Sequence, residues 1–391
     1  MGTLGSAAKT PRSGLQSSRE SAFAKIEHLV QANYENPDIE AVKVTLACMA
    51  AHRLVEYQPA WLMLIAPSGS MKTEILRTLD GLPGVSLVDE LTENTMISGK
   101  VDDPWRLRQG SPSFLHRMGN EGVLILADFS TILSMDPRKM RTILAQFRRL
   151  YDGDYAREFG TADNLEDRRW KGRLTVLAGC TPDIDRHHGA FQSLGERFSR
   201  VRLCRAGGVN SGLLAMRQDR SIAIRFKSAV HEFLLPVLSQ RQILAPFVPE
   251  HMLTNIASLG EFVALARVHV PRDRNSREID GEVAPEGNTR LPQQLAQVAC
   301  GWAALMGRSE VSHDDYLLAR RVGFDCIPPV RRAVLEGLRK GQKPHTLGLA
   351  ASTADRALED LVVVGLVKDE GDRRYSLSAQ AHELLLAIDP S

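Results

Sequence analysis

Between residue 61 and about residue 205, short runs of apolar residues alternate with amphipathic stretches. The runs lie at 61–66, 85–89, 122–128, 174–179 and 200–204. Strands that are apolar along their whole length, with helices between them, are typical of a parallel sheet that is covered on both faces. The pattern therefore predicts an α/β core over residues 58–208, built on a parallel sheet.

The segments on either side have helical spacing. Apolar residues at helical intervals predict a helical lead-in over residues 20–57 and a mainly helical region over 209–328. Residues 1–19 contain no acidic residue and few large apolar ones, so we expect a disordered tail there.

The last segment, residues 329–391, has the pattern of a winged helix. A helix that ends at Gly341 is followed by a short helix, a turn, a longer helix, and two short strands around Gly371. Ser352 is in position to cap the longer helix through its side chain.

Composition narrows the class of protein only slightly. The chain has 391 residues, 25 % of them charged, and a net charge of +2, so any binding to nucleic acid must come from local patches. Its apolar runs are too short to span a bilayer, which predicts a cytoplasmic protein without a membrane partner. The five cysteines are scattered and form no CxxC pair, which favours a reducing compartment and no zinc site.

The stretch 61–79 carries the main candidate chemistry. It runs from a strand through an altered phosphate-binding loop into a helix, and the loop is Ala66, Pro67, Ser68, Gly69, Ser70, Met71, Lys72 and Thr73. Main-chain amides in such a turn bind phosphate oxygens, Lys72 would reach the β- and γ-phosphates, and Thr73 would hold Mg²⁺. We expect Met71 to have a negative φ, which would make its side chain tolerable. The alternative is an ordinary strand, turn and helix with a chance lysine.

Further polar residues follow later strands of the predicted sheet. Asp128 ends the run 122–128 and could orient Mg²⁺, and Thr181 follows the next run and could contact a γ-phosphate. Phe129 stands where many ATPases with a phosphate-binding loop have a glutamate that polarises the attacking water, so hydrolysis of a nucleotide is less certain than its binding. Arg197 precedes the last predicted strand and could serve as an arginine finger for the nucleotide of a neighbouring subunit.

The order of these elements resembles AAA+ ATPases, and over residues 40–325 it resembles the minichromosome-maintenance helicases in particular. The matching stretches are "AGCTP", "LGERF" and the segment 288–321, which is similar to their helical lid. The resemblance supports Thr181 as a sensor and Arg197 as a finger, and it implies that Arg290 is a second sensor. It also implies ATP and Mg²⁺ as cofactors, DNA as a partner, other replication proteins as possible partners, and a homo-oligomeric ring, with a hexamer expected. The chain is also similar to ATPases of phages and integrated elements.

Two further groups of residues are candidates for DNA contact. Asp152-Gly153 predicts a hairpin turn, beyond which Arg157 would contact phosphates in the pore of the ring. A solvated helix with a structural hairpin is nearly as good an interpretation. In the winged helix, the groups expected to reach DNA are Thr353 and Arg356 in the major groove and Lys368, Arg373 and Arg374 at the phosphates.

Several functions remain open at this point. Glu359 and Asp360 lie on the same helix as Thr353 and would repel DNA, and winged helices also dock proteins. The sequence therefore favours a DNA motor or remodeller that acts in replication or maintenance of a mobile element. The alternatives are a nucleotide-sensing DNA-binding regulator and a helicase loader, both with little ATP hydrolysis.

Overall fold

The predicted parallel sheet is present and forms the centre of the molecule. The computed structural model describes residues 12–54, 58–97, 113–157, 169–187, 189, 191, 196–204, 207–217, 219, 221–273, 275–276 and 278–389. Within them the order of the five parallel strands is β2 (Val85–Val88), β3 (Glu121–Leu126), β6 (Arg173–Cys180), β1 (Leu62–Ile65) and β7 (Ser199–Arg202). All five runs of apolar residues are therefore strands, as the sequence predicts.

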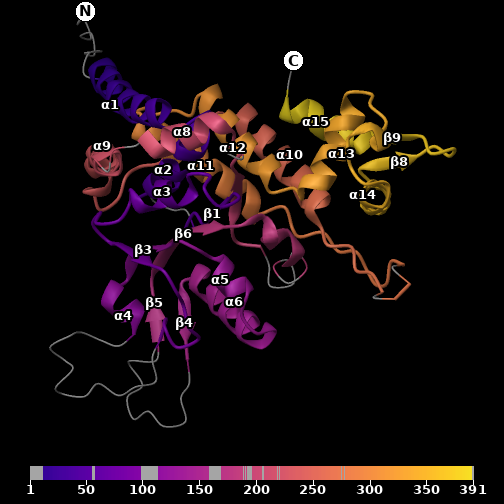
Figure 1. The fold of residues 1–391 in the computed structure, drawn as a ribbon, viewed down its shortest axis with the longest axis horizontal. Helices are drawn as coiled ribbons and strands as arrows, with labels where there is room; N and C mark the ends of the chain where they lie inside the picture. Colours follow the sequence, from indigo (N-terminus) through magenta and orange to yellow (C-terminus); the bar gives the residue numbers. More distant parts are fainter. Residues whose placement is uncertain are drawn as a thin grey trace, which may run out of the picture.

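The strands are apolar on both sides because helices cover both faces of the sheet. Along β1, Leu62 and Leu64 pack into one hydrophobic cluster, while Met63 and Ile65 pack into another on the opposite face. This alternation is the two-residue period of a strand. Figure 1 shows the sheet as a layer between helices above and below it.

The lower cover consists of helices and a small two-stranded sheet. These elements are α4 (Phe114–Met118), α5 (Ser130–Leu133), α6 (Pro137–Tyr151), β4 (Asp154–Ala156), β5 (Arg169–Lys171) and the 3-10 helix η3 (Pro182–His187). The hairpin predicted around Asp152-Gly153 is wrong. Gly153, at φ +77°, instead ends α6, and β4 pairs with β5 across residues that lie mostly outside the described part of the chain.

The upper cover is helical, as predicted for the lead-in and for residues 209–328. Its helices are α1 (Arg12–Asn33), α2 (Ile39–Ala51), α3 (Lys72–Arg77), α8 (Val209–Arg217), α9 (Ser221–Leu238), α10 (Glu250–Arg267), α11 (Arg290–Leu305) and α12 (His313–Asp325). The disordered tail predicted for residues 1–19 is wrong from residue 12 onward, because α1 begins there; residues 1–11 lie outside the described part. Aromatic contacts of Phe23 with Phe233 and Trp302 hold α1 to the other helices.

The C-terminal segment contains the predicted elements and one additional helix. It runs through α13 (Pro329–Arg339), η4 (Pro344–Thr346), α14 (Ala351–Val363), β8 (Val367–Asp369), β9 (Tyr375–Leu377) and α15 (Ala379–Ile388). The predicted cap at Ser352 is wrong, since Ala350 is the N-cap of α14 and makes no side-chain hydrogen bond there. The helix α15 was not predicted.

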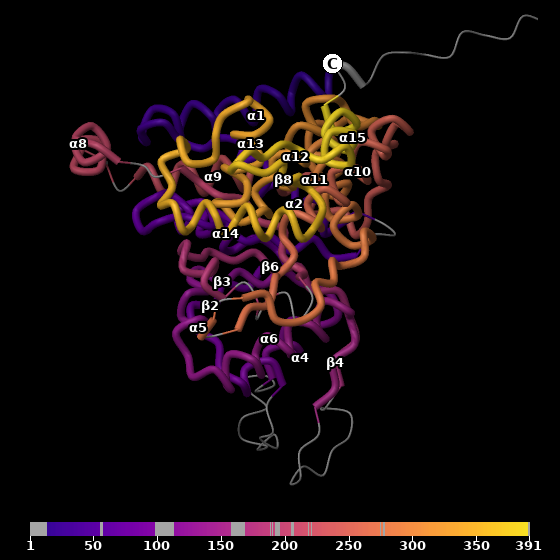
Figure 2. Tube along the Cα trace, turned by 90° about the vertical axis from the view of Figure 1, so that its right-hand side faces the viewer, coloured from indigo at the N-terminus to yellow at the C-terminus, as the bar shows by residue number. Residues whose placement is uncertain are grey.

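This segment is not a separate body. Residues of α13, α14 and α15 belong to the same hydrophobic cluster as the helices above the sheet. The Tyr316 hydroxyl in α12 donates a hydrogen bond of 2.6 Å to the carbonyl of Ile388 in α15. Figure 2 shows α13, α14 and α15 among the upper helices, with the sheet below them. Motion of the upper helices relative to the sheet would therefore carry this segment with them.

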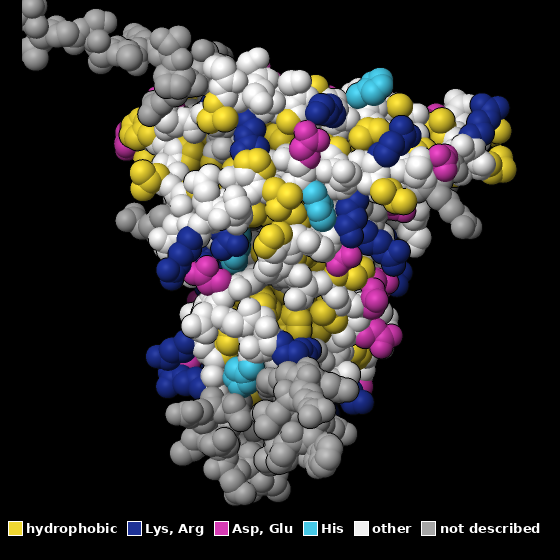
Figure 3. All heavy atoms as spheres, turned by 90° about the vertical axis from the view of Figure 1, so that its left-hand side faces the viewer, with side chains coloured by type: hydrophobic (Ala, Val, Ile, Leu, Met, Phe, Trp, Pro, Cys, Tyr) yellow, Lys and Arg dark blue, Asp and Glu magenta, His cyan; other side chains and the backbone are white. Residues whose placement is uncertain are grey.

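Charges of both signs are mixed on one face of the molecule. On the face drawn in Figure 3, lysine and arginine side chains are interspersed with apolar and acidic ones. Among the helices that the structure describes, none is both long and apolar enough to cross a membrane.

Candidate nucleotide site

The loop that follows β1 has two residues in the left-handed region, Gly69 and Met71. It is anchored where the Ala66 amide donates a hydrogen bond of 3.0 Å to the carbonyl of Cys180 at the end of β6. Gly69 has φ +77°, which an L-residue rarely adopts. Position 69 therefore favours glycine, whereas Ala66 does not have a positive φ.

Met71 contradicts the prediction of a negative φ. It has φ +62° and ψ −8°, in the left-handed region, and immediately precedes α3. Its side chain is nevertheless buried, with 6 % of its surface exposed. The turn needs the conformation that glycine provides there, and burial of the methionine side chain offsets the cost of about 1 kcal/mol or more.

Polar groups inside the loop have no partner in the described chain. The Ser70 hydroxyl is buried and without a hydrogen bond. Within the described residues, the amides from Ser68 to Thr73 also lack an intramolecular acceptor. Of these groups, only the Ser70 hydroxyl is a buried donor without a partner, whereas Ser68 and Gly69 are exposed and the Lys72 and Thr73 amides belong to the first turn of α3, where N–H groups have no intrahelical acceptor. Free amides at a helix N-terminus and a buried hydroxyl together fit a ligand that brings several acceptor oxygens, as a triphosphate does.

Two of the other predicted residues lie at the same edge of the sheet as the loop. Because β6 lies between β1 and β3 and all three are parallel, Thr181 is located between the loop and Asp128. Ser130 joins the two, since its hydroxyl donates to Thr181 Oγ1 at 3.2 Å and its amide donates to Asp128 Oδ1 at 2.9 Å. Because of this hydrogen bond, one carboxylate oxygen of Asp128 already has a donor. The Asp128 side chain is exposed to solvent.

The neighbouring Phe129 has a purely structural role. Its side chain is fully buried, and its ring lies 5.8 to 6.0 Å from the rings of Phe147, Phe191 and Phe198. A glutamate at this position would put a carboxylate into an aromatic cluster. The site therefore lacks an acid at this position because the position belongs to the core.

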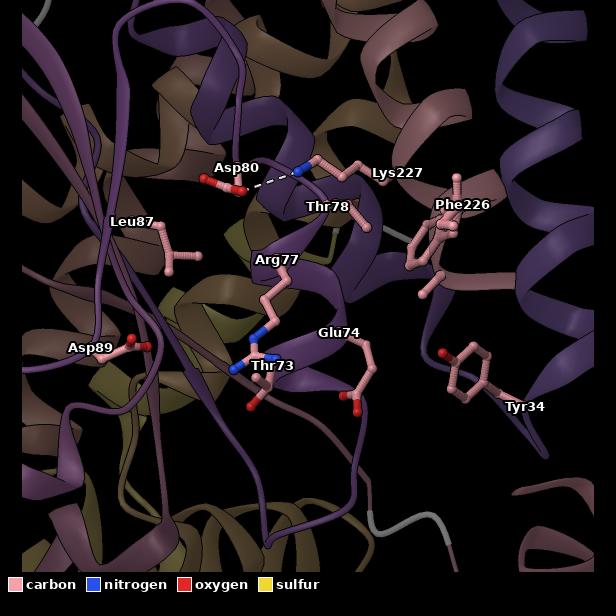
Figure 4. Close-up of a pocket in the computed structure, with 12 residues that line it drawn as sticks. Tyr34, Thr73, Glu74, Arg77, Thr78, Asp80, Leu87, Asp89, Phe226 and Lys227 are labelled. Atoms are coloured by element: carbon pink, nitrogen blue, oxygen red, sulfur yellow. Dashed lines mark hydrogen bonds and ion pairs between the residues drawn. The ribbon is translucent and has the colours of Figure 1, made fainter. Parts of the chain in front are cut away.

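A groove of about 520 Å³ adjoins the loop at Thr73, within the size range of small-molecule sites. Figure 4 shows its lining, which includes Tyr34 from the end of α1, Phe226 and Lys227 from α9, and Asp89 after β2. Asp89 lies on the opposite wall from Glu74, and Lys227 is paired with Asp80 at 3.0 Å.

Of these lining residues, only Asp89 could be suspected from the sequence, because it is an acid that directly follows a strand. Tyr34 and Phe226 come from helices whose apolar spacing resembles that of core residues, so no pattern in the sequence distinguishes them.

Arg197 and Arg290 lie together near the amino-terminal ends of β1 and β7, whereas the loop follows the carboxyl end of β1. Arg197 lies just before β7, whose first residue is level with the first residue of β1. The loop follows the last residue of β1, so the length of this four-residue strand, roughly 13 Å, lies between Arg197 and the loop. Both guanidinium groups lie over the ring of Tyr151, at 5.5 and 5.8 Å from its centroid. Arg197 is buried, 3.4 Å from a carboxylate oxygen of Asp152.

The electrostatics of this pair follow from burial. Burial lowers the pKa of the Arg197 guanidinium from its usual value, and the nearby positive charge of Arg290 lowers it further. Burial likewise raises the pKa of the Tyr151 hydroxyl. In this conformation neither arginine can reach the loop of its own chain.

Arg157 directly follows β4 of the antiparallel β4–β5 pair, but its guanidinium is directed back onto the protein. Its guanidinium donates hydrogen bonds to the main-chain carbonyls of Glu93 and Ile97, the second at 3.3 Å. It therefore fixes the loop that follows β2. The prediction of a pore contact receives no support from this arrangement.

The candidate DNA-binding residues of the C-terminal segment are all exposed: Thr353, Arg356, Lys368, Arg373 and Arg374. The two acids that should repel DNA are engaged by arginines. Arg272 donates to Glu359 at 3.0 Å and to Asp360 at 2.6 Å, and Arg331 donates to the second oxygen of Asp360 at 2.8 Å. The objection raised by the sequence is thus weakened.

Comparison of the chain with known protein families matched none of them, and comparison with curated proteins found no relative.

Proposed function

We propose that the chain is an ATP-binding P-loop ATPase of the AAA+ type, with α8 to α12 as its lid and residues 329–391 as a winged helix. The observation that carries this proposal is the loop between β1 and α3. It combines a left-handed Met71, a buried Ser70 hydroxyl without a partner, and amides without acceptors at one sheet edge.

The roles of the residues at this edge follow from their positions. Lys72 would neutralise charge on the terminal phosphates, and loop amides would hold the phosphate oxygens. Thr73 and Asp128 would hold Mg²⁺, which supplies the positive charge that offsets negative charge on the transferred phosphoryl group. Thr181 would contact the terminal phosphate through its hydroxyl, oriented by Ser130.

The positions of Arg197 and Arg290 favour action on a neighbouring subunit. They lie at the sheet edge opposite their own loop, so a triphosphate bound there is out of their reach. A second copy of the chain placed across the loop would bring its own pair toward the phosphates once Arg197 left Tyr151. This supports a homo-oligomeric ring, a hexamer by analogy with the helicases that the sequence resembles.

The same resemblance and the exposed cations of the winged helix support DNA as the substrate. The chain would act as a DNA motor or remodeller in replication or maintenance of a mobile element. Other replication proteins are further candidate partners, and ATP turnover would be coupled to movement of the lid.

The test of the site is direct. In Lys72→Ala the loop loses its cation, so we expect ATP affinity, measured by calorimetry or with a fluorescent analogue, to fall below detection. Lys340→Ala, which removes an exposed lysine far from the loop, serves as the control. Unchanged ATP affinity in Lys72→Ala would show that the loop is not a nucleotide site.

A second candidate function is favoured by Phe129. Phe129 is buried in the core, so this position supplies no acid to activate water for ATP hydrolysis. A nucleotide-sensing DNA-binding regulator, or a loader that hydrolyses little ATP, does not need such an acid. Steady-state ATP hydrolysis with and without single-stranded DNA separates the two. Turnover stimulated by DNA supports the motor, and Asp89→Asn then tests whether this carboxylate of the groove lining activates the attacking water. Binding without turnover supports the regulator.

A further inference from the structure

A second groove lies where the sheet layer, the upper helices and the C-terminal segment meet. It has a volume of about 470 Å³. Its lining includes η3, with Asp185 and Arg186, and the N-terminal half of α14, with Thr353 and Arg356. The segment after α10 and the start of α13 complete it.

The acids that line this groove are neutralised by other side chains. Arg202 contacts both carboxylate oxygens of Asp185, at 2.7 and 2.8 Å. The two oxygens of Asp360 are held by Arg272 and Arg331, as described above. Neither aspartate can therefore cancel a cation that points into the open groove.

Two arginines that line the groove are exposed to solvent. Arg356 is exposed and makes no ion pair within the described residues. Arg186 has 84 % of its side chain exposed, and its pairing with Asp183 at 2.9 Å is a surface contact of small free energy. The groove thus presents positive charge from two parts of the fold, together with the hydroxyl of Thr353.

The walls of the groove are fixed in place. Arg331 donates to the carbonyls of Ala266 and Val268 at the end of α10, the first at 3.1 Å, and also to Asp360. It therefore holds α14 against α10. Preformed walls of this kind reduce the ordering cost of binding.

The geometry suits one nucleic acid strand better than a duplex. A helix reads a duplex by entering its major groove, which is about 12 Å wide. Here residues of η3 and Gly189 line the same groove as Thr353 and Arg356, so a duplex that received α14 would also have to accommodate them. A single strand needs only a cationic channel for its backbone.

We propose that this groove binds the phosphate backbone of a single nucleic acid strand, with Arg186 and Arg356 as the phosphate contacts. The inference rests on the proposed function in taking DNA as the partner. It also connects the two sites, because η3 directly follows Thr181 and the Ile184 amide donates to the carbonyl of Thr181 at 3.3 Å. A shift of Thr181 on nucleotide binding would move Arg186.

The experiment measures binding of the full chain to a fluorescent 20-mer of thymidylate by anisotropy, without nucleotide, across a series of salt concentrations. In Arg186→Gln/Arg356→Gln we expect affinity at low salt to fall about tenfold. The slope of log K against log salt should become shallower by about 1.4, at about 0.7 per phosphate contact. The control is Arg225→Gln/Arg241→Gln, which removes two exposed arginines elsewhere.

The outcomes are distinct. A shallower slope confined to the groove variant supports the proposal. Unchanged binding, an equal loss in the control, or no binding of the single strand by the wild-type chain overturns it, and the last result leaves an acidic protein segment as the candidate partner. Tighter binding of a duplex, lost in the groove variant, also overturns it. If the single strand binds here but ATP does not bind at Lys72, the proposed ATPase function fails while this inference stands.

Discussion

The left-handed conformation of Met71 gives the most demanding prediction, because it determines which of two variants at this position, with alanine or with glycine, has the larger free energy of unfolding. We compare Met71→Ala with Met71→Gly. At an ordinary negative φ, glycine is less stable than alanine by about 0.5–1 kcal/mol, since it loses more backbone freedom on folding. At φ +62° the order should reverse.

The magnitude follows from two terms. Both variants lose the buried methionine side chain, which costs about 2–5 kcal/mol in a packed core. Only the alanine variant keeps the strain of a Cβ in the left-handed region, roughly 1–2 kcal/mol. We therefore expect Met71→Gly to be more stable than Met71→Ala by about 1 kcal/mol, while both are less stable than the wild-type chain.

Equilibrium unfolding in urea, followed by circular dichroism, gives the free energies of the three proteins. Gly84→Ala calibrates the strain, because Gly84 has φ +74° and open space for a Cβ. If Met71→Ala is the more stable of the two variants while Gly84→Ala shows the expected loss, the loop does not have the conformation described here. The argument for unpaired phosphate-binding amides then fails with it.

Two further predictions concern the core. Burial, together with the positive charges of Arg53 and Arg173, lowers the pKa of His52 to about 3, so the folded chain keeps this histidine neutral while the unfolded chain protonates it as the pH falls below about 6.5. The free energy of unfolding should therefore fall by about 2 kcal/mol between pH 7 and pH 5 because of this group. In urea unfolding, His52→Gln should lose less stability over this pH range than the wild-type chain, and an identical loss would contradict the lowered pKa. Gly301→Ala should destabilise the chain by about 1–3 kcal/mol despite better helix propensity, because its Cβ would lie 2.2 Å from the carbonyl oxygen of Ala47. Gly212→Ala in α8, where a Cβ meets open space, should instead be neutral or stabilising by up to about 1 kcal/mol, and the same sign in both variants would be inconsistent with close contact of α11 with α2.

Several features could be predicted from the sequence because they depend on local pattern. The five strands follow from apolar runs, since a strand buried on both faces tolerates few polar residues. The positions of Lys72, Asp128 and Thr181 at one sheet edge follow from parallel strands, whose carboxyl ends meet. The helix α6 follows from the spacing of Met140, Ile143 and Leu144, all of which are buried.

Other predictions failed where the local pattern had two solutions. Asp-Gly at 152–153 suits a hairpin turn, but a left-handed glycine also ends a helix, and the apolar face of α6 extends to Tyr151. Met71 would have a negative φ in an ordinary helix start, and only the path of the chain from β1 into α3 imposes the positive one.

By itself, then, the sequence determined the sheet, the order of its strands along the chain, and the residues that gather at its carboxyl edge. Only the tertiary structure decided that Phe129 belongs to an aromatic core, that Arg197 and Arg290 share the ring of Tyr151, and that the acids of α14 are neutralised by Arg272 and Arg331. The physical reason is that strands and helices follow from the spacing of neighbouring residues. The charge and burial of a side chain depend on partners that lie tens to hundreds of positions away in the chain.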